Sequence, residues 1–452
     1  MSGQKTALLL PVTAAMAALL APVPTFAQDS VVSAPAYGLA DTAYIATCCL
    51  FVMLMMLPGL ALFYGGMARS KNVLSVLTQV FAGACLVILL WTVIGYSLTF
   101  SVGPYQPVIG GLHKILLHGV TPQTAVGVLP EYLYYLFMAL FAAITPPIIV
   151  GAFAERMRFA AVLVFLGVWF LIDYVPMAHM AWGGGWVAGW GVQDFAGGNV
   201  VHMNAGVAAL VASIMIGRRR GLGTVVMAPH DMTMTYTGGC MLFVGWLAFC
   251  GGCDYAVSGH AIELVVNTML GGVGGALGWM VMEWLHRGRP STFGIVSGAV
   301  AGLVGITPAC GFVSPAGSIA VGVLTSGACI WAVDTLKLRF GYDDAFDVFG
   351  IHGVGAIVGG VLTTVFAWPV LGGVGYEHGR TLVSQMGVQL FIMGFSIAVS
   401  AVATVIAMKV AALTGGLRVA EDVEETGLDL PCHGEMAYRL NAFGGDDEAL
   451  FG

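Results

Sequence analysis

The sequence has very few charged residues, since Asp, Glu, Lys and Arg together make up 9% of its 452 residues. Soluble globular proteins carry about a quarter charged residues, so this composition excludes them. Hydrophobic residues make up 58%, and the mean hydropathy is strongly positive. The apolar runs are too long for barrel strands, and backbone in lipid must satisfy its hydrogen bonds within helices. The sequence therefore predicts an all-α polytopic membrane protein.

The sequence also lacks a large basic cluster and a disulfide framework. Its formal net charge is −7, with acids concentrated in the last 35 residues, and nothing in it favours binding to nucleic acid. Nine cysteines are scattered, mostly within apolar runs, and most are expected to pack in the core. Cys250 and Cys253 form a CxxC, which could be a redox or metal pair, although zinc would need a second such pair. We expect no metal, no cofactor and no enzymatic activity.

The first 27 residues are typical of a cleavable signal peptide. Lys5 supplies a positive charge, an apolar segment runs from Ala7 to Leu20, and Thr25-Phe26-Ala27 forms a small-residue cleavage site. A first spanning helix is the alternative, but three prolines and the short apolar segment disfavour it. We expect the mature chain to begin near Gln28, outside the cytoplasm.

Eleven apolar runs follow, each interpreted as a membrane-spanning helix. They lie near 43–68, 73–100, 132–154, 159–180, 199–217, 232–250, 262–285, 293–311, 317–336, 348–368 and 382–413. Lys and Arg are concentrated in every second loop, and the positive-inside rule places those loops in the cytoplasm. The N-terminus is then outside and the C-terminus is cytoplasmic. We expect a transmembrane domain over 28–416 and a cytoplasmic tail over 417–452.

Two segments share one pattern. Asp194-Phe-Ala-Gly-Gly-Asn-Val-Val-His202 and Asp347-Val-Phe-Gly-Ile-His352 each run from an acid through a glycine-bearing spacer to Val/Ile-His. Asp is a favoured helix N-cap, so we expect a helix to begin just after each acid. The segments lie in two halves of five helices, about 43–217 and 232–368. An odd number of spans inverts the second half, which predicts an inverted repeat plus a long last helix, 382–413.

A histidine within a membrane span indicates a functional site whose partner must be found. His202 and His352 occupy matching positions, and we predict that they meet in a narrow path between the halves. A neutral imidazole donates through one ring nitrogen and accepts through the other, so the pair suits a small polar solute or a proton. An intact cation in an apolar path costs several kcal/mol, whereas a protonated amine avoids that cost by losing its proton. The alternative is two core histidines bonded to backbone.

Several motifs together resemble those of one family, the ammonium transporters of the Amt/Mep/Rh superfamily, and its bacterial Amt branch in particular. These motifs are Pro58-Gly-Leu-Ala-Leu-Phe-Tyr-Gly-Gly66, Lys71-Asn-Val-Leu-Ser75, Ala152-Phe-Ala-Glu-Arg-Met-Arg158, Ala178-His-Met-Ala-Trp-Gly-Gly-Gly185, Asp194-Phe-Ala-Gly-Gly198, Thr307-Pro-Ala-Cys-Gly311, Asp347-Val-Phe-Gly-Ile-His-Gly353 and His433-Gly-Glu-Met-Ala-Tyr438. The resemblance implies a homotrimer in the bacterial inner (plasma) membrane. By this resemblance each subunit would have eleven helices and its own pore for ammonium or ammonia, with methylammonium as a further substrate.

The resemblance also implies roles along the pore. His202 and His352 match the family's twin pore histidines. Phe141 and Phe249 match the stacked phenylalanines that close the outer mouth, a constriction of the kind that gates by excluding water.

At the outer mouth, the resemblance implies that Phe141, Trp182 and Cys253 recruit ammonium, since aromatic ring faces attract cations. Cys253 stands where the family commonly has serine, and Met138 where glutamine is common. We therefore expect weaker recruitment, because a thiol is a poorer acceptor than a hydroxyl. Asp194 matches an acid that favours the cation electrostatically, and helix capping is an equal alternative.

The family's partner at the cytoplasmic face is a trimeric PII-type nitrogen regulator that inserts a loop into the pore exit. The tail patterns Gly427-Leu-Asp and His433-Gly-Glu favour such a partner, and a merely solvated tail is the alternative. The alternative function is an ammonium sensor or receptor with little flux. Methylammonium uptake in cells lacking other ammonium carriers would distinguish the two.

Overall fold

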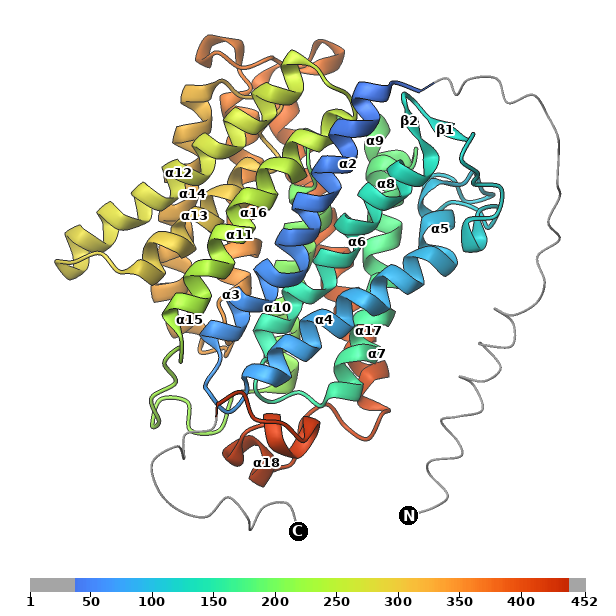
Figure 1. Ribbon diagram of the computed structural model, residues 1–452. Helices are drawn as coiled ribbons and strands as arrows, with labels where there is room; N and C mark the ends of the chain where they lie inside the picture. The colour runs from blue at the N-terminus through green and yellow to red at the C-terminus, as the bar shows by residue number, and fades with distance from the viewer. Residues whose placement is uncertain (1–36, 439–452) are drawn as a thin grey trace. The chain divides into compact units, whose positions relative to one another are not determined.

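The computed structural model describes residues 37–438 (Figure 1). The signal peptide expected over 1–27 and the end of the expected tail, 439–452, lie outside the described residues. Within 37–438, ten helices are long and apolar enough to cross a membrane. They are Leu39–Met67, Val73–Phe100, Glu131–Phe153, Phe159–Gly189, Gly198–Ile216, Met232–Asp254, Gly259–Arg287, Pro315–Phe340, Phe349–Phe366 and Leu382–Ala412. The predicted polytopic, all-α fold class is confirmed.

The exact number of eleven spans is not confirmed. The run expected over 293–311 forms α13, Thr292–Ile306. This helix has 15 residues and is shorter than the ten spans of the described chain. Pro308 lies two residues beyond its end, and proline disfavours helical backbone at the residue before it. The segment after Ile306 therefore continues as a turn, in which Ala309 and Cys310 both donate to the Ile306 carbonyl.

Many of the spans contain π-helical turns, so that one span comprises several elements. The α-helices are α2 Leu39–Leu54, α3 Leu60–Met67, α4 Val73–Leu90, α5 Tyr96–Phe100, α6 Glu131–Phe153, α7 Phe159–Trp169, α8 Val175–Trp182, α9 Trp186–Gly189, α10 Asn204–Ile216, α11 Met232–Gly251, α12 Gly259–Arg287, α13, α14 Pro315–Trp331, α15 Lys337–Phe340, α16 Val354–Phe366, α17 Leu382–Ala412 and α18 Glu421–Thr426. The π-helices are η1 Met55–Gly59, η2 Trp91–Gly95, η4 Phe170–Tyr174, η5 Gly198–Met203, η7 Ala332–Leu336, η8 Phe349–Gly353 and η11 Asp429–His433.

A short hairpin and four 3₁₀ turns complete the described chain. Strands β1 Ala125–Val126 and β2 Leu129–Pro130 pair antiparallel, with Val126 opposite Leu129. The 3₁₀ turns are η3 Ile115–Leu117, η6 Gly252–Asp254, η9 Pro369–Leu371 and η10 Glu377–Gly379. We call the end of the bundle near β1 and β2 the hairpin end, and the end at which α18 lies the tail end (Figure 1).

Glycines allow α12, α13 and α14 to approach closely. A Cβ on Gly275 of α12 would lie 2.3 Å from the Gly298 carbonyl oxygen of α13, and one on Gly322 of α14 would lie 2.0 Å from the Gly271 carbonyl oxygen. No side chain fits at these distances, so glycine is required at both contacts.

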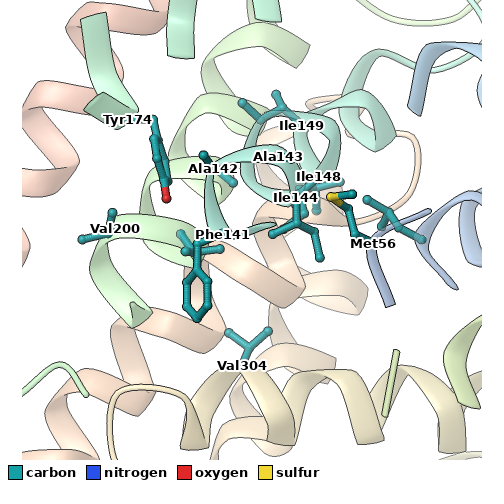
Figure 2. Packing of buried hydrophobic residues seen from close by; sticks show 14 of the residues in the cluster. Met56, Phe141, Ala142, Ala143, Ile144, Ile148, Ile149, Tyr174, Val200 and Val304 are labelled. Atoms are coloured by element: carbon teal, nitrogen blue, oxygen red, sulfur yellow. The ribbon is translucent and has the colours of Figure 1, made fainter. Parts of the chain in front are cut away.

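Helix α6 lies in the middle of the core. Most of its residues are buried, and Figure 2 shows its Phe141, Ile144 and Ile148 in the buried hydrophobic cluster that also contains Val200 and Val304 from other elements. A helix that is apolar all round is expected to be enclosed by other helices or by lipid. Here α4 and α10 pack against it, so α6 can form one wall of an internal path.

Candidate functional site

The two predicted histidines meet inside the bundle. The Nδ1 atoms of His202 and His352 are 3.2 Å apart, and the rings stack with centroids 5.3 Å apart. Both residues are buried. The helices that carry them cross closely, because a Cβ on Gly206 would lie 2.2 Å from the Gly353 nitrogen. The structure therefore places the two histidines together, 150 residues apart in sequence.

The contact between the histidines fixes how their protons are shared. A hydrogen bond between two Nδ1 atoms requires one ring to carry the proton and the other to offer a lone pair. With both rings neutral, one Nε2 is then an acceptor and the other a donor. Nε2 of His202 is buried and has no partner among residues 37–438. The pair can thus both donate to and accept from one small solute.

Trp246 is a site residue that the sequence analysis missed. Its ring stacks on His202 with centroids 4.9 Å apart, and its Nε1 donates to Thr307 Oγ1 at 2.8 Å. Stacking on a fixed ring restricts the rotation of the imidazole. An aromatic residue in an apolar span gives no signal of this role, because most such residues are packing.

Both histidines lie in π-helical turns, η5 and η8. Such turns are rare and are frequent at functional sites. A carboxylate holds the start of the first turn, since Asp194 accepts from the Gly198 nitrogen at 2.5 Å and the Asn199 nitrogen at 2.8 Å. The helix begins at Gly198, a few residues later than predicted. Burial raises the pKa of Asp194 to about 6, although the hydrogen bonds that its carboxylate accepts from backbone N–H groups lower this pKa.

The carboxylate that caps the second turn is Asp344 and not Asp347. Helical backbone does begin just after Asp347, as predicted, but the Asp347 side chain accepts from Lys337 Nζ at 2.7 Å. Asp344 Oδ2 accepts from the Phe349 nitrogen at 2.6 Å. The signal was present in the sequence, because Asp194 precedes His202 by eight residues and Asp344 precedes His352 by eight. The prediction of Asp347 as the cap used the glycine-bearing spacer and did not use the spacing of eight residues.

Two stacked phenylalanines lie on the hairpin-end side of the histidines. The rings of Phe141 and Phe249 are 3.8 Å apart at an interplanar angle of 18°, and both residues are about 1% exposed. Phe249 is also next to His202, with centroids 6.4 Å apart. Trp182 and Phe141 lie nearly perpendicular to each other, with ring centroids 6.0 Å apart. The structure thus brings together Trp182, the phenylalanine pair and the histidines in one row.

Cys253 lies one turn beyond Phe249 and is partly buried. Its thiol donates to the Phe249 carbonyl at 3.2 Å, so it has no proton left to donate to a solute. Met138 is buried, and its sulfur accepts from the Tyr255 hydroxyl at 3.4 Å. Both predicted departures from the family pattern therefore place sulfur near the aromatic row, where a hydroxyl or an amide would be a stronger hydrogen-bonding group.

The free space along the row is small. A cavity of about 10 Å³ is lined by both histidines, Trp246 and Phe249, and a second of about 30 Å³ lies on the other side of His352, next to Asp347. The smaller one has about the space that a single water needs. A larger cavity of about 560 Å³ lies between α10 and α15 and contains none of the predicted site residues. A hydrated metal cation does not fit the row as it stands.

The cysteines of the CxxC are both free, as are the other seven cysteines of the chain. Cys250 is buried, and Cys253 is the one nearer to the mouth of the row. Within residues 37–438, no three His, Cys, Asp or Glu residues are grouped so that they could hold a metal ion.

Comparison with known proteins gives one consistent result. Residues 43–438 match the model of the Ammonium Transporter Family. The ammonium transporter of Bacillus subtilis is 42% identical over 406 residues, which cover 89% of this chain and 99% of that protein. The ammonium transporter of Aquifex aeolicus is 40% identical, over 88% of this chain and 93% of that protein.

Solved structures resemble this protein over most of its length. The crystal structure of Candida albicans Mep2 matches with a TM-score of 0.77 at 34% identity, covering 86% of this chain and 88% of that chain. A structure titled Sensor Amt Protein matches with a TM-score of 0.80, covering 87% and 98% of the two chains. At 24% identity, this second likeness shows a shared fold alone.

Proposed function

The chain belongs to the ammonium transporter family, and from this premise we propose that it takes ammonium at an aromatic site and conducts ammonia past the two histidines. Transport of ammonium is the function of its named relatives, including one that is 42% identical over nearly its whole length. The path and the steps along it are our proposal. The observation that carries them is the row formed by Trp182, the Phe141–Phe249 pair and His202–His352.

In the first step, Trp182 and Phe141 attract ammonium through their ring faces, each contributing about 0.5–2 kcal/mol. Cys253 adds little, because its proton is bonded to a backbone carbonyl and its sulfur is a weak acceptor. Asp194 lies close by with its two oxygens bonded to backbone N–H groups. We assign Asp194 to holding the start of η5, and any electrostatic effect on the cation is secondary.

In the second step, ammonium gives its proton to water on the outer side of the Phe141–Phe249 pair, and neutral ammonia continues inward. An ion at this depth costs several kcal/mol or more, and the stacked rings leave no polar group to replace its water shell. Neutral ammonia is about as large as water, so it fits the cavity of about 10 Å³ beside the histidines. The donor and the acceptor of the histidine pair match a molecule that both donates and accepts. Potassium has no proton to lose and is rejected.

Membership of the family also suggests the membrane in which the protein lies, its oligomeric state and its regulatory partner. We propose a multi-pass protein of the bacterial inner membrane, with the hairpin end outside and the tail end in the cytoplasm, and a homotrimer as its working form. The basic residues of the tail end support this orientation, since Arg69, Arg156 and Arg219 all lie in its loops. A PII-type regulator remains the proposed partner at that end, where the tail packs against the N-terminus of α4 through Asp429.

Methylammonium uptake tests the function and its path together. In cells lacking other ammonium carriers, we expect the wild-type chain to restore uptake and potassium not to compete. Replacing both histidines, His202→Leu with His352→Leu, is expected to reduce uptake by at least about tenfold, because each leaves the path without its donor and acceptor. The surface variant His118→Leu serves as the control and is expected to keep wild-type uptake.

The alternative, an ammonium sensor with little flux, predicts a different result. A wild-type chain that is inserted in the membrane and binds methylammonium without accumulating it would contradict the transporter. The named relatives favour transport, and the likeness to the sensor structure concerns the fold alone.

A further inference from the structure

Asp173 is an acid that the proposed path does not use. It lies in η4, within the span Phe159–Gly189, and is fully buried. Among residues 37–438, neither of its oxygens has a hydrogen-bond partner. An unpaired carboxylate at this depth costs several kcal/mol, so intramembrane acids are expected to have a function and to be neutral or paired.

The position of Asp173 follows from how two helices pack. Helix α7 and helix α17 are in contact, and Trp169 Nε1 of α7 donates to Thr404 Oγ1 of α17 at 3.0 Å. Asp173 follows Trp169 by one turn and Ser400 precedes Thr404 by one turn, so Asp173 lies next to Ser400, with no hydrogen bond between them in this arrangement. The two helices are therefore antiparallel here, with a polar pair on each of two successive turns.

The hydrogens available at this contact can be counted. A serine hydroxyl has one proton, and Ser400 donates it to the Asn204 carbonyl at 2.8 Å. Ser400 can then only accept from Asp173, and a carboxylate has nothing to donate. Asn204 Oδ1 is a further buried acceptor without a partner among the described residues. The cluster thus contains several acceptors and lacks one donor, which a proton on Asp173 would supply.

The cluster is joined to the turn that carries His202. Asn204 follows His202 by two residues, so the two side chains project from opposite sides of the helix. His202 faces His352, and the other side of the turn faces α17, where Ser400 binds it. A hydrogen-bond chain from Asp173 through Ser400 to Asn204 would therefore fix how far this turn extends toward the other histidine. Successive bonds in such a chain strengthen one another in a low-dielectric interior.

We propose that Asp173 is a positioning residue for the ammonia path: as a neutral acid it donates to Ser400, and Ser400 in turn holds the His202 turn in place. The acid acts through backbone and touches neither ammonium nor the histidines. This inference rests on the proposed function, since the path is what the positioning serves.

Three variants in the full-length chain test the role by methylammonium uptake. Asp173→Asn keeps a donor of the same shape and is expected to retain uptake within about twofold, whereas Asp173→Leu removes the donor and is expected to lose about tenfold, the effect of one lost buried hydrogen bond. Ser400→Ala should resemble Asp173→Leu. Combining Asp173→Leu with Ser400→Ala should add no further loss, because both break one chain.

Thr404→Val is the matched control, since it breaks the neighbouring contact of the same two helices without touching Asn204. We expect it to leave uptake near wild type. A loss with Thr404→Val as large as with Asp173→Leu would overturn the proposal, because general helix packing would then explain both. Equal losses in Asp173→Asn and Asp173→Leu would also overturn it, because the acid and not the donor would then be required.

An infrared measurement keeps the inference separate from the proposed function. In purified wild-type protein, we expect the carbonyl band of a protonated carboxylic acid, which Asp173→Asn removes. If that band is present while wild-type cells take up no methylammonium, the proposed transport fails and the neutral acid stands. If uptake is normal and the Asp173→Asn variant shows the same band as wild type, the neutral acid is excluded and the positioning inference fails.

Discussion

At the scale of single residues, the proposed path depends on side chains whose hydrogen-bonding partners are fixed. His202 is held by His352 on one side and by the Trp246 ring on another. Trp246 is in turn held by Thr307. The His202 ring therefore has a defined orientation, and its Nε2 is buried and has no protein partner in the described chain. An unpaired donor or acceptor in such a place is available to a passing solute.

Cys253→Ser is expected to retain or improve uptake at low methylammonium concentration. A serine hydroxyl can donate to the Phe249 carbonyl as the thiol does, and its oxygen is a better acceptor for ammonium. The measurement is the apparent KM for uptake, expected to fall with little change in the maximal rate. Cys240→Ser, at an exposed cysteine, is the control. A large loss of uptake in Cys253→Ser alone would contradict the recruitment role proposed for this position.

At the scale of elements, the positions of the two histidines depend on two short π-helical turns and on the acids that cap these turns. Asp194 holds η5 and Asp344 holds η8, in each case eight residues before the histidine. Asp347 lies nearer to His352 but has a positive φ of 60° and directs its carboxylate to Lys337. Backbone geometry, and not closeness to His352 in the sequence, therefore determines which aspartate caps η8.

Asp344→Ala is expected to destabilise the protein by about 1 kcal/mol, a typical cost of losing an N-cap, and to reduce uptake. Asp344→Asn should retain most of both, because asparagine caps a helix about as well as aspartate does. Thermal unfolding in detergent and methylammonium uptake measure the two effects. Asp347→Asn, which keeps a residue tolerant of a positive φ, is the comparison and should have the smaller effect on η8. Equal damage from the Ala and Asn variants at Asp344 would show that its charge, and not the cap, is needed.

At the scale of the whole molecule, buried ion pairs join loops of the two sequence halves at the tail end. Arg219, after α10, pairs with Asp343, before η8, at 2.9 Å and with Glu155, after α6, at 3.2 Å. Arg156 is fully buried and donates to backbone carbonyls, including that of Gly217 at 2.9 Å. These contacts join the loops that follow α6 and α10 to the loop that precedes η8. They therefore help to hold the turns η5 and η8, which carry the two histidines, in their relative positions.

Asp343→Asn is expected to lower stability by about 3–5 kcal/mol, because it leaves the Arg219 guanidinium buried without its main partner. Burial raises the pKa of Asp343, but the hydrogen bonds and charge of Arg219 and the charge of Arg156 outweigh it, so the pKa lies below its ordinary value. The stability from this carboxylate is therefore present above about pH 3.9, the value for an unfolded Asp, and is lost as the pH falls below it.

Thermal unfolding measured against pH checks this expectation. The wild-type Tm should decline more steeply than that of Asp343→Asn as the pH falls through this range. Glu421→Gln is the matched control, since Glu421 pairs with Arg220 while 81% exposed, and exposed pairs contribute little. If Glu421→Gln proves as destabilising as Asp343→Asn, burial is not what gives the Arg219–Asp343 pair its effect.

The membrane fold and the pairing of His202 with His352 could both be predicted without a structure. Long apolar runs have one stable solution in lipid, helices whose backbone bonds are internal, so the spans could be located without a structure. His202 and His352 could be paired because each follows an acid and a glycine-bearing spacer in the sequence. The resemblance to a family then indicated Phe141, Phe249 and Trp182, which the structure brings into one row.

Only the tertiary structure decided the contacts that cross between distant segments. Trp246 against His202, Asp344 as the cap of η8 and the Ser400–Asn204 hydrogen bond each depend on where helices far apart in sequence come together. A local pattern specifies which residues are apolar and which backbone they favour, but not which partner a buried polar group will meet. That choice follows from helix packing, because a group removed from water must find its hydrogen bonds among whatever neighbours the fold provides.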